Sequence, residues 1–561
     1  MRKLQIIILI ILGSYLVTTG QNVPKIDDKL QQEITQHKKS EKLRINIILN
    51  EQYNQAEMRT KMQHIRSEEE KRSFAVNELK HFSQETQKNL IRYLSDMRAK
   101  TTVSDIQSLW IANTITCYAS IEIIEELSKH PDVLIIGLDN EQRMIPESSK
   151  PTQEIDSNVV TKVQAVDPNR EITYNITKVR ANEVWAQGYT GQNVVVAILD
   201  TGVNYNHSDL SGNMWTHPDY PYHGWNFVSN NNNPMDDHSH GTHCAGTVAG
   251  QGASGTYTGI APNAKIMAIK VWNSSAYGSI FQMCDGIQFA TDNGAHVISM
   301  SGGIQGGGNM YERIMFRNTM INVLNMGIVA TIAAGNEGTK VYPPNSVRTP
   351  GNCPPPWLHP DQTDQTEQGG LTAVISVGAT DQNDNIWEDS SRGPIMWQDI
   401  AGFNDYSGAG LIRPDVVAPG VDIKSLARTG GYVEDSGTSM ATPCVAGVIA
   451  LMLSKHPNLT PAKICEILET TAQPLSATKS NIYGSGRIDA YKAVQAVQAA
   501  CITITNFTNQ TVTANRTIAD CVINVQNVTV QNNAKLTLDA VNVTTINGPF
   551  EVKLGSQLEV K

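Results

Sequence analysis

Three residues that lie far apart in the chain, Asp200, His240 and Ser439, carry side chains that together can cleave an acyl bond. A serine hydroxyl is a weak nucleophile until a histidine takes its proton and an acid orients that histidine. Ser439 stands two residues after Gly437, at the start of a long apolar run that ends at Leu453. This pattern predicts a helix that begins at the serine, where the free N–H groups stabilise developing negative charge.

Two prolines bound this predicted helix. Pro443 fits the first helical turn, where a missing N–H costs nothing, and Pro457 marks the far end. The sequence therefore predicts a nucleophilic serine at the N-terminus of a buried helix.

The three residues stand in short motifs whose order along the chain is informative. Asp200 opens Asp-Thr-Gly, His240 opens His-Gly-Thr-His, and Ser439 is the serine of Gly-Thr-Ser-Met-Ala. The order Asp, His, Ser differs from that of α/β-hydrolases and of chymotrypsin-like enzymes. With Ala-Ala-Gly-Asn at 333–336 and Arg-Pro-Asp-Val-Val-Ala-Pro-Gly at 413–420, the chain resembles the subtilisin-like serine proteases, in particular their bacillopeptidase F-like branch.

The resemblance implies a role for each residue of this triad. Ser439 would attack the scissile carbonyl, His240 would move the proton to the leaving amine, and Asp200 would hold the imidazole. Asn336 would aim its side-chain amide at the oxyanion, although an asparagine before Gly338 is also typical of a turn. The implied enzyme is a serine endopeptidase that needs no cofactor for its chemistry.

The resemblance also implies two extended segments that wall the pocket for the substrate residue before the cut. They comprise Ser301, Gly302, Gly303, Ala333, Ala334 and Gly335. Glycines there let a substrate backbone approach and pair as an added strand. Relatives commonly have leucine after the residue matching Ser301, whereas this chain has Gly302, so the preference of the pocket stays open.

Two groups of residues raise the question of a bound metal ion. Asp209 resembles a family calcium ligand, but the loop at 252–259 is short and lacks the usual asparagine. A structural calcium ion and an aspartate in a turn therefore both stay open. A second cluster has the spacing of zinc ligands, but a serine protease needs its histidine free, so we expect buried structural residues there instead. This cluster comprises His238, His240, His243 and Cys244.

Length, charge and the N-terminus bound the class of protein. The 561 residues are 40% hydrophobic and carry a net charge of −10, which argues against a nucleic-acid partner. Arg2 and Lys3 precede a short apolar run, so residues 1–20 are expected to be a secretory signal peptide, with a membrane anchor as the weaker alternative. The mature chain shows no transmembrane segment. We expect a secreted or extracellular enzyme that acts on proteins and peptides.

Residues 21–145 are expected to form a separate unit. Its apolar patterns predict a β-α-β-α-β order that resembles the inhibitory propeptide of subtilisin-like enzymes, with an unrelated α+β domain as the alternative. The chain's own propeptide would then be a partner of the peptidase. The expected strands lie at 44–49, 106–118 and 133–139, and the expected helices at 57–99 and 121–129.

Residues 146–171 are polar and are expected to be a linker with the processing site, so that the mature chain starts near Ile172. From 172 to 500, apolar runs alternate with helical patterns, which predicts an α/β fold with a parallel sheet and helices on both faces. Asp200 and Asn336 would lie just beyond strand ends, where such sheets place their sites. The expected strands lie at 194–199, 266–271, 296–300, 328–334 and 373–378, the helices at 279–292 and 310–325, and a surface loop at 342–370.

Residues 501–561 change character and are rich in Thr, Val and Asn. Alternating apolar and polar residues predict a small all-β module, in which stacked short repeats are one arrangement. Cys501 and Cys521 are plausible disulfide partners in an exported protein. Retention at the cell surface through this module is the alternative to free secretion.

Two other functions stay open on the sequence alone. A binding-only homologue would keep the fold without catalysis, but the intact triad and Asn336 argue against it. The other is a structural surface protein whose functional part is the module 501–561. Deletion of this module would then leave proteolytic activity in place but abolish retention at the surface.

Overall fold

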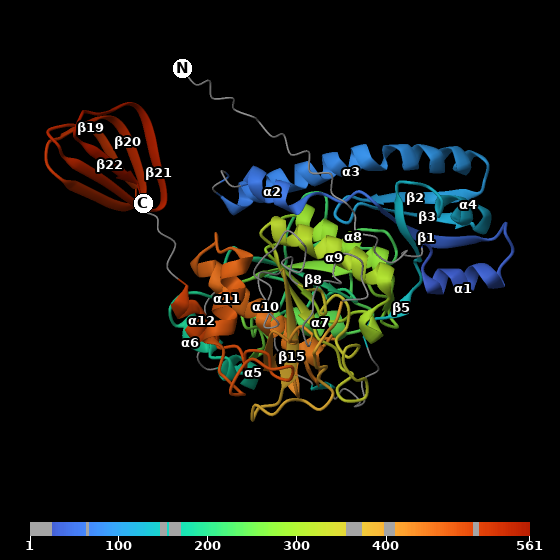
Figure 1. The fold of residues 1–561 in the computed structure, drawn as a ribbon. Coiled ribbons are helices and arrows are strands. Elements are labelled where there is room, and N and C mark those ends of the chain that lie inside the picture. The colour runs from blue at the N-terminus through green and yellow to red at the C-terminus, as the bar shows by residue number, and fades with distance from the viewer. Residues whose placement is uncertain are drawn as a thin grey trace, which may run out of the picture. The chain divides into compact units, whose positions relative to one another are not determined.

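The computed structural model describes residues 25–145 except 63, 64 and 66, and residues 154–155, 170–354, 373–397, 410–497 and 504–560. The chain forms two compact units, Met1–Ser454 with Leu459–Ala496, and Lys455–Asn458 with Val497–Lys561. Figure 1 shows the fold. The expected signal peptide and most of the expected linker lie outside the described residues.

The N-terminal part of the first unit is an antiparallel sheet in the order β2-β3-β1-β4 with a long helix, α3. The buried side chains Leu90 and Leu94 of α3 join the strand residues Ile45 and Ile115 in one apolar cluster. The elements are α1 (Asp28–Gln36), β1 (Lys42–Leu49), α2 (Gln55–Met62), α3 (Glu68–Ala99), β2 (Val103–Leu109), β3 (Thr114–Ser120), α4 (Ile121–Leu127) and β4 (Val133–Leu138).

The β-α-β-α-β order expected for this part is wrong in three places. Helix α1 was not expected, and the helix expected at 57–99 is two helices, of which α3 begins after the N-cap Ser67. The single strand expected at 106–118 is the hairpin β2–β3, whose turn contains Asn113 with φ 44°. The turn escaped notice because Ile111 and Ala112 are apolar and fully buried, as strand residues would be.

The peptidase part contains a seven-stranded parallel sheet in the order β16-β15-β14-β13-β8-β11-β9. All five expected strands are present, each within two residues of its expected bounds. The two strands that were not expected are three and four residues long, too short to show a pattern. The strands are β8 (Val195–Asp200), β9 (Gly224–Asn226), β11 (Lys265–Lys270), β13 (Val297–Met300), β14 (Val329–Ala333), β15 (Val374–Thr380) and β16 (Val416–Pro419).

Helices cover this sheet. In Figure 1, α8 and α9 lie between the sheet and α3. Among the described residues, one helix, α10, is long and apolar enough to cross a membrane, but 89% of it is buried inside the protein, which accounts for its composition. The helices are α5 (Tyr174–Lys178), α6 (Ala181–Trp185), α7 (His240–Ala249), α8 (Ile280–Asp292), η1 (Gln305–Gly307), α9 (Met310–Asn325), α10 (Thr438–Lys455), α11 (Pro461–Thr471) and α12 (Ala490–Ala496).

Short strand pairs complete the first unit and involve the expected linker region. Strand β5 pairs antiparallel with β12, β6 with β18, and β7 parallel with β10. The strands are β5 (Gln142–Arg143), β6 (Glu154–Ile155), β7 (Glu171–Ile172), β10 (Thr256–Tyr257), β12 (Tyr277–Gly278), β17 (Ile423–Leu426) and β18 (Tyr432–Asp435).

The surface loop expected at 342–370 is in part wrong. Residues 346–354 are buried, including Arg348 and Cys353, because they pack beside the segments that follow β13 and β14. Residues 355–372 lie outside the described part of the chain.

The second unit is an all-β module of four strands in parallel succession, β19-β20-β21-β22. The side chain of Asn524 donates to Asn506, 18 positions earlier, and Thr537 donates to Glu559, 22 positions later. Such pairing of each strand with the next is the stacked short repeat considered above. Its strands are β19 (Ile504–Val512), β20 (Arg516–Val530), β21 (Lys535–Val552) and β22 (Gln557–Val560). The expected disulfide between Cys501 and Cys521 lies outside the described residues.

Candidate active site

Asp200 and His240 form a buried pair at the carboxyl end of the sheet. Asp200 is the last residue of β8, and His240 is the first residue of α7. The imidazole Nδ1 lies 2.8 Å from Oδ1 and 3.0 Å from Oδ2 of the carboxylate. Burial lowers the pKa of His240, but the charge of Asp200, together with the neighbouring Cys244 and the hydrogen bond to Asp200, outweighs this effect, so the pKa lies well above its ordinary value. The pair is therefore built to stabilise an imidazolium ion.

The other imidazole nitrogen is available as a proton acceptor. His240 Nε2 is buried and has no hydrogen-bond partner among the described residues. Other buried side-chain atoms share this property, and Nε2 is distinguished from them by lying on the ring whose other nitrogen bonds Asp200. The hydroxyl of Ser439 is also buried and donates to the main-chain oxygen of Ser301 at 2.7 Å. In the absence of substrate, hydrogen bonds between catalytic groups are often poorly aligned and tighten only in the complex.

Ser439 is the second residue of α10, so its N–H is one of those at a helix start without an acceptor in the helix. Pro443 lies in the second turn, not in the first as predicted, because α10 begins at Thr438. A proline there removes the N–H that would bond the carbonyl oxygen of Ser439. Two other donors use this oxygen, Ser301 Oγ at 2.9 Å and Cys244 Sγ at 3.5 Å.

Cys244 therefore connects the nucleophile with the base. Its Sγ also lies 3.9 Å from Nδ1 of His240, one turn earlier on α7. Burial raises the pKa of the Cys244 thiol, which keeps it protonated and able to donate. The thiol thus holds α7 against the start of α10.

Asn336 lies beside the nucleophile. Its side-chain oxygen accepts from the N–H of Thr438 at 3.0 Å and from its Oγ1 at 2.7 Å. These two bonds fix the orientation of the amide and leave Nδ2 as a donor. Nδ2 lies close to Gly437, where an added Cβ would be 3.1 Å from this nitrogen. An amide nitrogen so placed can donate to an oxyanion beside Ser439.

The two expected walls meet at the carboxyl ends of β13 and β14. Ser301, Gly302 and Gly303 follow β13, and Ala333, Ala334 and Gly335 end and follow β14. The main-chain oxygen of Met144, from the N-terminal part, accepts from the Gly303 N–H at 3.2 Å. At Gly302 a Cβ would lie 2.9 Å from that oxygen, so the glycine allows the close approach.

The groups around Asp209 do not fit a calcium ion. Its Oδ1 accepts from the Ser254 N–H and Oγ, both at 2.8 Å, and its Oδ2 accepts from the Tyr432 hydroxyl at 3.0 Å. A calcium site is built from several oxygen acceptors, whereas these three neighbours already use the carboxylate oxygens as hydrogen-bond acceptors. We therefore assign Asp209 the structural role of tying a turn to β18.

The cluster considered for zinc is used otherwise. His243 Nε2 donates to the main-chain oxygen of Ile423 at 2.9 Å. Asp200, His240 and Cys244 have ligand atoms within 4.8 Å of one another, as metal ligands would. However, Nδ1 of His240 already bonds the Asp200 carboxylate. These contacts make Cys244 a support of the His240–Asp200 pair.

Residues 191–486 match the model of the Subtilase family. The chain belongs to this family. Subtilases are serine endopeptidases, so by family the chain is one of them.

Individual subtilases match over long stretches. Subtilisin DY of Bacillus licheniformis is 36% identical over 324 residues, which are 58% of this chain and 99% of that protein. Subtilisin of Bacillus pumilus is 35% identical over 58% of this chain and 100% of that protein. Bacillopeptidase F of Bacillus subtilis is 30% identical over 78% of this chain, but this chain spans only 29% of its length.

Two residues of the site were not predicted from the sequence. Arg348 and Glu337 form a buried ion pair at 2.6 Å beside the two walls. Glu337 directly follows Asn336, and this position could have drawn attention to it. Arg348 lies in a run rich in Pro and Asn that carries no signal of its own.

Proposed function

We propose that this subtilase is a secreted endopeptidase made as a self-inhibited zymogen, with Asp200, His240 and Ser439 as its catalytic triad. The observation that carries the assignment is the buried bond between His240 and Asp200, which leaves Nε2 as an acceptor, together with the Cys244 thiol that contacts both His240 and Ser439 at a helix start. Export is proposed because residues 1–20 read as a signal peptide. Retention through the C-terminal module remains the alternative location.

The geometry supports acyl transfer in two steps. His240 Nε2 takes the proton of Ser439 Oγ as the oxygen attacks the substrate carbonyl, and the resulting oxyanion accepts from Asn336 Nδ2 and the Ser439 N–H. The imidazolium then gives the proton to the leaving amine, and an acyl-enzyme remains. Water, deprotonated by the same imidazole, releases the acid and restores the serine.

Labelling with a fluorophosphonate tests this assignment, because only an activated serine displaces fluoride from such a probe. We expect one phosphonate per mature molecule, on the peptide that contains Ser439. Mass spectrometry of the digested protein locates the adduct. An unlabelled protein, or a label on another serine, would contradict the triad proposed here.

The N-terminal part is proposed to be an inhibitory propeptide because its end pairs as an added strand with segments proposed to line the substrate groove. Strand β5 pairs antiparallel with β12, and Met144 N–H then donates to the Ala276 oxygen at 2.9 Å. The Met144 oxygen accepts from Gly303 on the other side. A peptide held on both edges blocks the strand pairing that a substrate needs. Maturation is proposed to occur within residues 146–171.

The same part also packs on α8 and α9. The buried hairpin turn donates the N–H of Trp110 at 2.9 Å to Oε1 of Gln288 on α8, and the oxygen of Ile111 accepts from Asn322 of α9 at 2.7 Å. This docking explains why the turn is apolar. The docking also covers a surface of α8 and α9 that would otherwise face water.

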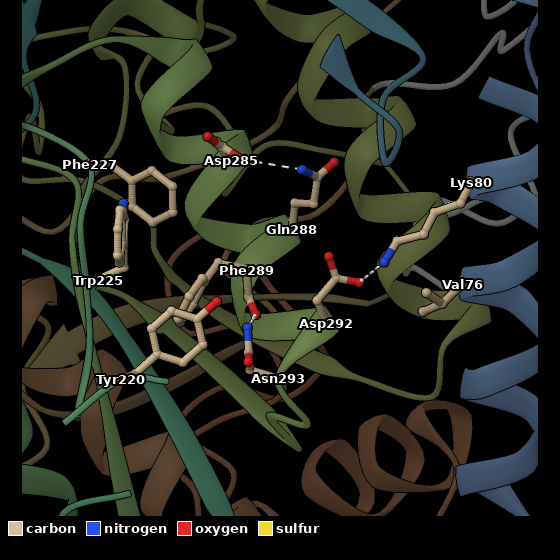
Figure 2. Close-up of a pocket in the computed structure, with 10 residues that line it drawn as sticks. All are labelled: Val76, Lys80, Tyr220, Trp225, Phe227, Asp285, Gln288, Phe289, Asp292 and Asn293. Atoms are coloured by element: carbon tan, nitrogen blue, oxygen red, sulfur yellow. Dashed lines mark hydrogen bonds and ion pairs between the residues drawn. The ribbon is translucent and has the colours of Figure 1, made fainter. Parts of the chain in front are cut away.

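A cavity of about 410 Å³ lies along this seam, between α3 and α8 (Figure 2). Lys80 of α3 reaches across to Asp292 of α8 at 2.8 Å. The cavity contains none of the proposed catalytic residues, so it belongs to the seam and not to the active site. Its lining comprises Val76, Lys80, Tyr220, Trp225, Phe227, Asp285, Gln288, Phe289, Asp292 and Asn293.

The isolated propeptide, residues 21–145, is expected to inhibit the mature enzyme completely when added in large excess. Inhibition is measured as the rate of peptide hydrolysis against propeptide concentration. A propeptide that ends at residue 139 is the matched control, because it keeps the hairpin and α3 but lacks β5 and Met144. It should inhibit much more weakly. Equal inhibition by both would show that the added strand is not the inhibitory element.

A further inference from the structure

Arg348 is a buried cation with two separate sets of partners. Its side chain, 4% exposed, donates from Nε at 2.9 Å and from Nη2 at 2.6 Å to one carboxylate oxygen of Glu337. The other oxygen of Glu337 accepts from the Ser391 hydroxyl at 3.0 Å. The carboxylate therefore fixes one edge of the guanidinium group and neutralises its charge.

The opposite edge of the guanidinium faces the peptide in the groove. Nη1 of Arg348 donates at 3.1 Å to the main-chain oxygen of Gly303 and at 2.5 Å to that of Met144. The Met144 oxygen thus receives two donors, this Nη1 and the N–H of Gly303. The hydrogen bond from Arg348 to the bound strand thus goes to a main-chain oxygen of the strand.

The walls are shaped around this arginine. A Cβ on Gly335 would lie 2.9 Å from Cγ of Arg348, and a Cβ on Gly303 would lie 3.5 Å from its Cβ. The main-chain N–H of Arg348 also donates at 2.8 Å to the oxygen of Ala334. The side chain is therefore held between the two walls, where a substrate must lie.

We propose that Arg348, positioned by Glu337, binds the main-chain carbonyl of the substrate residue that takes the place of Met144. The inference rests on the proposed function, because it treats the propeptide strand as a stand-in for an extended peptide substrate. A main-chain acceptor is present in every peptide, and the ion pair is neutral as a whole. The site therefore selects for length of extended chain and not for side-chain charge.

A substrate gains from this donor only when it is long enough to supply that carbonyl. We expect kcat/KM of the mature enzyme to rise steeply when a series of peptide amides is extended upstream of the cut past that residue. Arg348→Met should make this rise about 10- to 100-fold smaller, which is the effect typical of a lost charged hydrogen-bond donor. The measured quantity is the ratio of kcat/KM between long and short peptides.

Arg413→Met is the matched control. Arg413 is also fully buried and bonds the carboxylate of Asp415 at 2.9 Å and the main-chain oxygen of Cys353 at 3.0 Å, neither of which is a wall residue. Its long-to-short ratio should equal that of the wild type. Should Arg348→Met fail to fold, Arg348→Lys takes its place, since lysine keeps a cation for Glu337 without the two-edged fork.

The outcomes separate this proposal from the proposed function. A ratio for Arg348→Met, or for the lysine variant, that matches the wild type would overturn the role of Arg348 while leaving the triad intact. A wild-type enzyme that hydrolyses neither the short nor the long peptides would instead contradict the proposed function. A reduced ratio at Arg348 with an unchanged ratio at Arg413 supports the main-chain clamp.

Discussion

Ser439→Ala is expected to lower kcat by about 10⁶-fold, because it removes the only atom that forms the acyl bond. The loss should be as large as that from removing the whole triad, since His240 has no proton to take once the hydroxyl is gone. The residual rate would come from the oxyanion donors and substrate binding. Hydrolysis of a peptide amide by purified protein measures the effect.

The same substitution should also stop maturation if the enzyme cuts its own propeptide. We expect the Ser439→Ala precursor to stay at full length while the wild-type precursor shortens, as seen by mass spectrometry over time. Ser436→Ala is a suitable control, because its hydroxyl lies near the same helix start but bonds Asp422. A Ser439→Ala protein that matures and cleaves casein at the wild-type rate would refute the triad.

The parts of the fold that the sequence predicts well are those with long, regular patterns. The helices α8 and α9 begin one residue or none from their expected starts, because Ser279 and Asn309 cap them through capping boxes. The five buried strands were recognisable as short, mostly apolar runs. Patterns of this kind need no tertiary information.

The errors arise where tertiary contacts replace a local signal. The hairpin turn at Asn113 is apolar because it is buried against α8 and α9, and burial hid the polar residues that usually mark a turn. Pro443 was placed in the wrong turn because the contacts that make a proline tolerable there come from residues far away in the sequence. The carbonyl that it frees on Ser439 is taken by Ser301 and Cys244, which come from other parts of the chain.

The site shows the same division. Its reacting residues lie in motifs that resemble a known family, and the structure brings Asp200 and His240 into hydrogen-bond contact. Arg348 has no such motif, and its role depends on the walls, on Glu337 and on a strand from the N-terminal part. Chemistry carried by a local motif can be read from the sequence, whereas chemistry assembled from three segments needs the structure.

Asp200→Asn should lower kcat by about 10⁴-fold while the protein stays folded. Oδ1 of Asp200 accepts from the N–H of Thr201 at 2.7 Å, which would hold the oxygen of the asparagine amide in place. Its NH₂ group would then face Nδ1 of His240 and donate to it. The imidazole would be forced to carry its proton on Nε2, where it cannot accept one from Ser439.

The pH dependence gives this prediction a second readout. The carboxylate of Asp200 raises the pKa of His240 against the lowering effect of burial. Activity requires neutral imidazole, so it rises with pH through this pKa, and removing the carboxylate should move the acidic limb of the kcat profile to lower pH. Asp209→Asn is the control, because Asp209 is equally buried but bonds only structural donors. It should leave kcat and the acidic limb unchanged and lower only thermal stability. An Asp200→Asn enzyme with the wild-type kcat, or with an unmoved acidic limb, would show that Asp200 does not orient the base.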